Sequence, residues 1–159
     1  MIDYDRILSN LFIGTYPQSP ADVRELQERL GITAVINLQT DEDLRQRGMD
    51  WPAMKTLYEK MNIEAHRIPM RDFDYDHQKE RLPFAVNTLS GLIACGRIVY
   101  LHCSAGVCRS PLVAMAYLHW CLNMDFDESV KYVKTRRQCS PYEDLFLIRP
   151  KNLSECPEG

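Results

Sequence analysis

The sequence lacks the features that would place it in a membrane or on a nucleic acid. No apolar run approaches the ~18 residues that mark a transmembrane helix, and the first ten residues have the pattern of neither a signal peptide nor a transit peptide. The net charge is −3, so no broad basic surface exists for nucleic acid or an acidic membrane. We expect a cytoplasmic protein, or a plastid one if a transit peptide has been removed, with no nucleic-acid or membrane partner.

Metal ligands and paired cysteines are also scarce. The four histidines are scattered, and none of the six cysteines belongs to a Cys-x-x-Cys pair, so we expect no metal site and no cofactor. This cysteine usage suits a reducing compartment better than a disulfide scaffold. The 159 residues, 45% of them hydrophobic, suit one domain with a sizeable core. We assign the domain to residues 1–150 and a polar tail to residues 151–159.

Predicted strands and helices alternate along the chain. Short runs rich in β-branched residues predict a hairpin over residues 7–13 and strands over 33–38, 63–68 and 98–101. Helical spacing and caps predict helices after Ser19, over 51–61, 82–95 and 112–122, after Asp127 and over 142–148. The charged turn over residues 41–47 is interpreted as a solvated face. The alternation predicts an α/β domain with a central, mainly parallel sheet flanked by helices.

The stretch from Ile98 to Pro111 carries the strongest functional pattern. It reads as a buried strand, a tight loop and the start of a helix, with Pro111 in the first helical turn. Cys103 and Arg109 flank five loop residues. The loop N–H groups and the helix N-terminus can point at one anion, and the residues that would line it are Ser104, Ala105, Gly106, Val107 and Cys108.

Each residue type in this loop suits phosphate chemistry. A helix N-terminus and a nearby cation stabilise a thiolate, so Cys103 is the candidate nucleophile. Arg109 offers a planar fork that grips two phosphate oxygens. Ser110 places a hydroxyl near the sulfur, where it can stabilise the thiolate as a leaving group, and His102 precedes the nucleophile.

Cys108 lies in the same loop as Cys103 and has two interpretations. It can act as a resolving thiol that protects Cys103 from over-oxidation, because a sulfenic acid condenses with a nearby thiol. Alternatively, it is a small side chain that packs under the loop.

A second candidate segment is the acidic and aromatic loop from Pro69 to His77, directly after a predicted strand. Ligands bind at such strand ends in α/β sheets. Asp72 is the preferred general acid because it comes first after the strand and precedes Phe73, which can stack on a substrate ring. Asp74 and Asp76 are alternatives, and a solvated acidic turn is the non-functional interpretation.

The loop from His102 to Ser110 resembles the signature of the cysteine-dependent phosphatases, in the form used by dual-specificity enzymes. The resemblance implies that Cys103 attacks phosphorus to give a phosphocysteine and that Arg109 binds the phosphoryl oxygens. It also implies that an Asp protonates the leaving group and then activates the hydrolytic water, without a metal.

Further blocks resemble the plant glucan phosphatases of the starch-excess type. Gly14–Asp22 matches the family's Gly-x-x-Pro-Gln-x-Pro-x-Asp stretch, Val35–Gln39 with the acidic residues that follow matches the next block, and Arg71–Asp74 resembles its acid loop. The resemblance implies a phosphorylated glucan as substrate and Phe73 as a glucan contact. A neutral polymer is gripped by aromatic faces, and the other candidates, each with core packing as its alternative, are Tyr16, Trp51, Tyr75 and Tyr142.

The chain also departs from the glucan phosphatase pattern. Cys108 and Ser110 stand where the plant enzymes have Gly and Ala, and Ser140-Pro141-Tyr142 replaces Gly-Pro-Asn. The rival interpretation is a dual-specificity protein phosphatase that acts on phospho-Tyr and phospho-Ser/Thr. A more remote one is a non-catalytic phosphate-recognition module, which would usually lack the nucleophile or the arginine. The sequence leaves the oligomeric state open.

Overall fold

A five-stranded sheet forms the centre of the computed structural model, which describes residues 2–151 and 153. Its strand order is β1-β2-β5-β3-β4. Only β1 runs antiparallel, paired with β2, while β2, β5, β3 and β4 are mutually parallel. The expected hairpin and mainly parallel sheet are therefore confirmed. The strands are β1 (Tyr4–Leu8), β2 (Leu11–Gly14), β3 (Ala34–Asn37), β4 (Glu64–Arg67) and β5 (Val99–His102).

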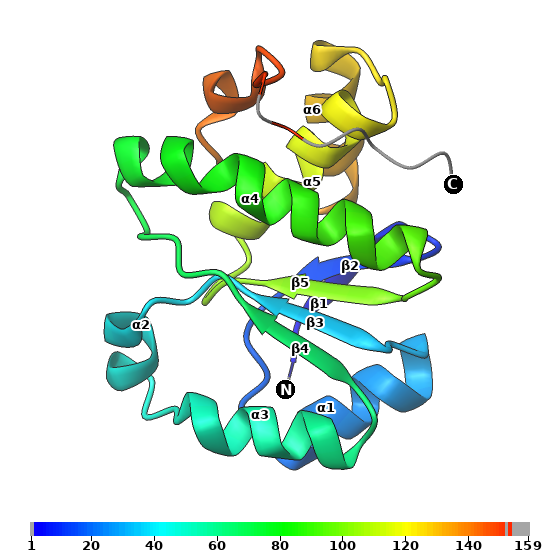
Figure 1. Ribbon diagram of the computed structural model, residues 1–159, viewed down its shortest axis with the longest axis vertical. Coiled ribbons are helices and arrows are strands. Elements are labelled where there is room, and N and C mark those ends of the chain that lie inside the picture. Colours follow the sequence, from blue (N-terminus) through cyan, green and yellow to red (C-terminus); the bar gives the residue numbers. More distant parts are fainter. Residues whose placement is uncertain (1, 152, 154–159) are drawn as a thin grey trace.

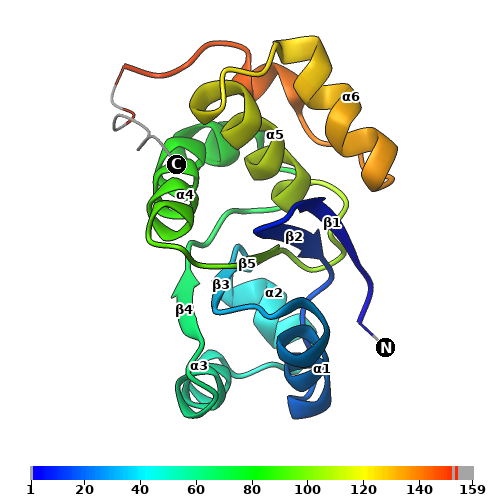
Figure 2. The ribbon, with the colours of Figure 1, turned by 90° about the vertical axis from the view of Figure 1, so that its right-hand side faces the viewer.

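Helices cover both faces of the sheet and give three layers (Figures 1 and 2). One face carries α1 (Pro20–Glu25), which continues into η1 (Leu26–Leu30), together with α2 (Asp41–Gln46) and α3 (Trp51–Lys60). The other face carries α4 (Tyr75–Ala94), α5 (Arg109–Cys121), α6 (Phe126–Arg136) and the short turn η2 (Glu143–Phe146). No helix among residues 2–151 combines the length and apolar character needed to cross a bilayer.

Two apolar clusters, one on each face of the sheet, hold these layers together. Along β5, Val99 and Leu101 face one cluster and Tyr100 faces the other, as the period of two in a strand requires. Most of α5 is buried because it lies between the sheet, α4 and α6. The nearly continuous apolar sequence of α5 therefore reflects its central position in the fold. Because α5 is packed on several sides, it fixes the position of the loop that precedes it.

Several helices differ from the sequence prediction. α4 begins at Tyr75, inside the segment expected to be a loop, because the Asp74 side chain accepts the His77 N–H as an N-cap. Pro83 consequently lies inside α4 and not near its start. α6 follows Asp125 and not Asp127. The helix expected over residues 142–148 is only the 3-10 turn η2. Of the predicted tail, residues 152 and 154–159 lie outside the described part.

The parallel strands all end at one edge of the sheet. Gly14 of β2 pairs with His102 of β5, which pairs with Asn37 of β3, which pairs with Arg67 of β4. The loops that follow these strands therefore start level with one another. This edge is where an open α/β sheet binds ligands, and the Cys103 loop and the Asp72 loop both begin there.

Candidate active site

The loop between β5 and α5 wraps around the sulfur of Cys103. This side chain is only 2% exposed. The Gly106 N–H donates a hydrogen bond to Cys103 Sγ at 3.3 Å, and Ser110 Oγ lies 3.5 Å from the same sulfur. Gly106 has a φ of +70°, and a Cβ there would lie 2.6 Å from the Gly14 carbonyl carbon. The loop thus has the tight curl that its sequence predicts, with a donor aimed at the nucleophile.

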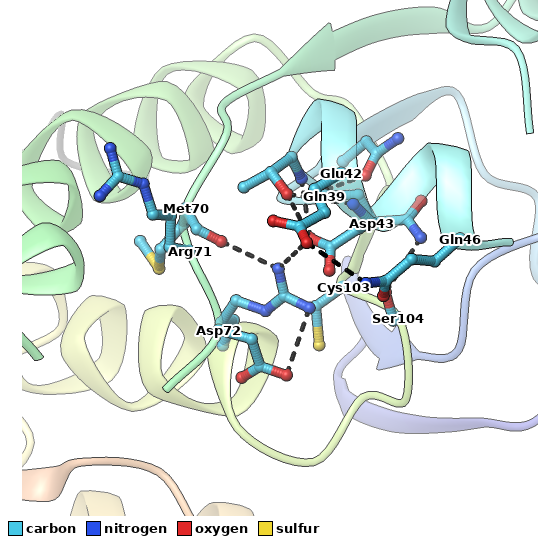
Figure 3. Close-up of polar contacts among 12 residues, drawn as sticks. Gln39, Glu42, Asp43, Gln46, Met70, Arg71, Asp72, Cys103 and Ser104 are labelled. Carbon is cyan, nitrogen blue, oxygen red and sulfur yellow. Dashed lines mark hydrogen bonds and ion pairs between the residues drawn. The ribbon is translucent and has the colours of Figure 1, made fainter. Parts of the chain in front are cut away.

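Arg109 is the first residue of α5 and is 1% exposed. Its guanidinium contacts Asp43, Met70 and Asp72, and Figure 3 labels these three partners. Its Nη1 donates to Asp43 Oδ2 at 2.6 Å and to the Met70 carbonyl oxygen at 2.9 Å. Its Nη2 lies 3.5 Å from Asp72 Oδ2. Its Nε is buried and has no hydrogen-bond partner in the described part of the chain. Because both short hydrogen bonds of the guanidinium are donated by Nη1, the edge formed by Nε and Nη2 is available to bind two oxygens of an anion.

Asp43 is the site residue that the sequence analysis missed. The segment 41–47 was interpreted as a solvated face, and this is wrong at Asp43, whose carboxylate is 18% exposed and bonded to Arg109. Asp43 also completes a capping box with Thr40 at the start of α2. Partial burial raises the pKa of Asp43, but hydrogen bonds from Arg109 and Thr40 outweigh it and leave the pKa below its ordinary value. The Thr-x-x-Asp spacing was the available signal, but it indicated only a helix start.

Among the three candidate acids, the geometry favours Asp72. Its Oδ1 is buried and unpaired within the described residues, and its Oδ2 faces Arg109. Asp74 is instead used as the N-cap of α4 and forms an ion pair with Arg71 at 3.3 Å. The His77 N–H, followed by Arg71, lowers the pKa of Asp74. Asp76 is exposed in the first turn of α4.

His102 is buried beneath the loop. Burial lowers its pKa to about 4, so the imidazole is neutral near pH 7. A neutral ring must donate from Nδ1 to use its 3.0 Å contact with the Cys103 carbonyl oxygen. The ring also stacks on Tyr100 at a centroid distance of 5.7 Å. The neutral His102 ring can therefore donate a hydrogen bond to the Cys103 backbone without placing a positive charge beside Cys103.

Two cavities meet at the acid loop. One, of about 690 Å³, is polar and lies between α2 and the acid loop, with Ser104, Arg109 and Asp43 in its lining. The other, of about 470 Å³, is lined by Cys103, Ala105, Val107 and other residues of the loop and its surroundings. Asp72 and Phe73 line both cavities and therefore lie at their common border.

Three of the five predicted aromatic contacts lie at these cavities. Phe73 is 77% exposed and adopts a φ of +57°. Tyr142 lines the 470 Å³ cavity and meets the ring of Tyr75 edge-on at 5.6 Å, and Tyr75 lines the polar cavity. Trp51 instead packs near Tyr58, at 6.4 Å, in the second apolar cluster. Tyr16 lies under Arg47, with 5.7 Å between the guanidinium carbon and the ring centroid, and lines neither cavity.

Cys108 is partly buried and lines the same 470 Å³ cavity as Cys103. Its Sγ donates to the Ser140 carbonyl oxygen at 3.4 Å. Burial raises the pKa of the Cys108 thiol, as do the negative charges of Asp72 and Cys103. Cys95, Cys103, Cys108 and Cys139 carry free thiols.

Metal binding finds no support within residues 2–151 and 153. No group of three or more His, Cys, Asp or Glu side chains there is arranged to hold a metal ion. The charged groups that pair directly at the Cys103 loop are Arg109 and the carboxylates of Asp43 and Asp72. Such a set can bind an oxyanion on the arginine and exchange a proton through a carboxyl group.

Comparison with known proteins agrees with this arrangement. The family model described as the dual specificity phosphatase catalytic domain matches residues 11–147. The chain belongs to this family. Within it, the chain is 33% identical over 145 residues to the phosphoglucan phosphatase DSP4, amyloplastic, of Castanea sativa. It is 31% identical over 144 residues to laforin of Mus musculus.

These alignments cover most of this dual specificity phosphatase domain but not most of the relatives. They include 90% and 84% of the chain, yet only 38% and 44% of the chestnut and mouse proteins. The chain thus spans about two fifths of the length of these two relatives. Among solved structures, the PTP-2 phosphatase of Cydia pomonella superposes with a TM-score of 0.76 at 22% identity, over 92% of this chain and 89% of that one. That likeness supports the fold.

Proposed function

We propose that this domain hydrolyses phosphate monoesters through a phosphocysteine intermediate. The Cys103 sulfur attacks phosphorus and forms a P–S bond, the bond to the leaving oxygen breaks, and Asp72 supplies the proton that this oxygen takes. Water then attacks phosphorus, its proton passes to the Asp72 carboxylate, and the P–S bond breaks to release inorganic phosphate. Ser110 donates a hydrogen bond to the departing sulfur.

One observation supports this reaction above the others. The buried Arg109 keeps its Nε free of any partner in the described residues, while Nη1 is held and Nη2 faces Asp72. Asp72 lines both the polar cavity that contains Arg109 and the cavity that contains Cys103, so the proposed acid lies between the anion-binding edge and the proposed nucleophile. A phosphate-recognition module without catalysis would not require an unpaired carboxyl oxygen on Asp72 in the lining of the cavity that Cys103 also lines.

We further propose a phosphorylated glucan as the substrate. Two relatives that this chain resembles bear the names phosphoglucan phosphatase and laforin. The 470 Å³ cavity beside Cys103 is lined without any lysine or arginine, and Phe73 and Tyr142 form part of its wall. Neutral sugar rings pack well on such aromatic faces. Phe73 is the contact that we expect to matter most, since its ring is free to meet a polymer.

The dual-specificity protein phosphatase is the second candidate. Arg47 and Arg71 line the polar cavity on the other side of the acid loop, and acidic residues that flank a phosphorylated side chain would bind there. The chain's family includes a dual specificity protein phosphatase 1-B of Xenopus laevis among its relatives. Substrate comparison separates the two candidates.

The deciding experiment measures phosphate release from solubilised phosphorylated amylopectin, from a phosphotyrosine peptide and from a small aryl phosphate. Cys103→Ser serves as the blank, and retained activity in it would contradict the phosphocysteine mechanism. A high ratio of glucan to aryl phosphate turnover supports the glucan proposal. Phe73→Ala should then lower the glucan rate about tenfold while leaving the aryl rate unchanged within a factor of two. Cleavage of the peptide alone would favour the second candidate.

The compartment stays a prediction, with the cytoplasm first and the plastid second. The chestnut relative carries the word amyloplastic in its name. Fractionation of cells that express the full-length protein, with plastid and cytosolic markers, tests this choice.

A further inference from the structure

Arg137 is a second buried arginine that contacts the loop between β5 and α5. It follows α6 directly, and its side chain is 5% exposed. Its Nε donates to the Gly106 carbonyl oxygen at 2.7 Å, and its Nη2 donates to the Ala105 carbonyl oxygen at 3.2 Å. Both acceptors belong to the loop that encloses Cys103. The reaction proposed above does not use this residue.

Acidic residues of the first strand region hold the Arg137 guanidinium in place. Asp5 Oδ2 lies 2.8 Å from Nη1, and Asp3 Oδ2 lies 3.4 Å from Nη2. The guanidinium is therefore fixed from one side by carboxylates and donates from the other side to the loop. The guanidinium also lies close to the loop: a Cβ added at Gly106 would be only 2.7 Å from Arg137 Nη2.

One peptide unit links Arg137 to the nucleophile. The Ala105 carbonyl, which accepts from Arg137, and the Gly106 N–H, which donates to Cys103 Sγ at 3.3 Å, are the two ends of the same planar amide. Fixing the oxygen of this amide fixes the direction of its N–H. Hydrogen bonds in such a chain also polarise one another. A cation on the carbonyl strengthens the N–H as a donor toward negative charge.

We propose that Arg137 is a positioning residue for the phosphatase reaction: it holds the Ala105–Gly106 peptide so that its N–H stabilises the Cys103 thiolate and the bound phosphoryl group. This inference rests on the proposed function. The competing explanation is that Arg137 merely joins α6 to the first strand. In that case its loss lowers stability and leaves the chemistry of the folded protein unchanged.

The test compares Arg137→Met with the matched control Arg136→Met. Arg136 is the neighbouring residue, is exposed, and lies over the ring of Tyr132, so its variant removes the same charge from the same helix end. Two readouts report on the thiolate and the anion site without any substrate: the pH profile of Cys103 alkylation by iodoacetamide, with Cys103→Ser as blank, and the inhibition constant of inorganic phosphate.

We expect Arg137→Met to shift the alkylation profile to higher pH, with about tenfold slower alkylation near pH 6, and to weaken phosphate inhibition about tenfold. Arg136→Met should match the parent within a factor of two. Arg137→Lys keeps a cationic donor and should recover part of both effects. Arg137→Met with a lower melting temperature, but with the parental profile and inhibition constant while folded, would overturn the proposal.

A second variant covers the case in which Arg137→Met does not fold. Asp5→Asn leaves Arg137 in place but weakens its anchor, so both readouts should move in the same direction by about two- to threefold. Unchanged readouts in Asp5→Asn would then contradict the proposal. If the parent releases phosphate from none of the substrates tested, the proposed function fails. The alkylation profiles still decide the role of Arg137 separately.

Discussion

The contact between Asp43 and Arg109 leads to a specific prediction for Asp43→Asn. The substitution keeps the size of the side chain and leaves an oxygen that can accept from Arg109 and from Thr40. It removes the charge from a hydrogen bond of 2.6 Å to a guanidinium that is almost fully buried. The hydrogen bond to the Met70 carbonyl then becomes the stronger of the two that Arg109 Nη1 donates. We therefore expect the guanidinium to turn away from the orientation that binds an anion.

The size of the effect follows from the strength of such contacts. A hydrogen bond to a charged group contributes about 1.5–3 kcal/mol, and the partial exposure of Asp43 places this one toward the lower end. Since 1.4 kcal/mol corresponds to a factor of ten, kcat/KM should fall about tenfold or somewhat more. The pKa of Asp43 lies below its ordinary value, so the carboxylate is ionised throughout an assay at pH 6–7 and its contribution is lost only in strong acid.

Asp41→Asn is the matched control. Asp41 lies in the same turn of α2 and is 85% exposed, and it pairs with Arg67 instead of Arg109. Removing a negative charge near the site would by itself favour anion binding, so a fall in kcat/KM specific to Asp43→Asn identifies lost orientation. The assay is steady-state hydrolysis of an aryl phosphate. Equal kcat/KM values in the two variants, or a rise in Asp43→Asn, would refute the reasoning.

Three other predictions concern the acid, the buried histidine and the second loop cysteine. Asp72→Ala should lower kcat at least tenfold more than Asp74→Ala, and the reverse ranking in the same assay would move the general acid to Asp74. The pKa of His102 is lowered to about 4 in the folded protein, so as the pH falls below ~6.5 the histidine is protonated in the unfolded chain first. The free energy of unfolding should therefore drop by up to about 3 kcal/mol by pH 4. Urea titrations of the parent and His102→Gln should differ in this pH range, and a parallel pH dependence of the two would exclude the effect. Mild peroxide should inactivate the parent reversibly, because the Cys108 thiol can condense with a Cys103 sulfenic acid with loss of water, whereas Cys108→Ser should lose activity irreversibly; equal recovery with dithiothreitol would favour the packing role of Cys108.

The sequence predicted the sheet and the nucleophile loop because both depend on local patterns. Buried strands can be predicted from apolar runs in the sequence. In the strand–loop–helix segment from Ile98 to Pro111, the candidate functional residues also lie close together in the sequence. The helix ends were harder to predict, since several Asp residues near each start can act as the cap. In the structure α4 follows Asp74, whose side chain caps it, and α6 follows Asp125, whose side chain makes no capping hydrogen bond.

The contacts between distant segments could not be predicted in the same way. Asp43 and Arg137 are charged residues in charged runs, a pattern typical of a solvated helix face. Arg137 is buried and Asp43 is partly buried because the fold brings each against a segment far away in the sequence, 66 residues away for Asp43 and Arg109. Trp51 shows the converse, since its aromatic character suggested a sugar contact but its place on α3 directs it to the core.

The backbone of Phe73 has a consequence for how this position would change under selection. A non-glycine residue with a φ of +57° costs of order 1 kcal/mol or more, and the exposed ring of Phe73 recovers little of that by burial. Glycine and asparagine adopt this conformation at lower cost. A library of variants at this position that is sorted for thermal stability should therefore enrich glycine and asparagine. The same library sorted for turnover of a phosphorylated glucan should retain phenylalanine.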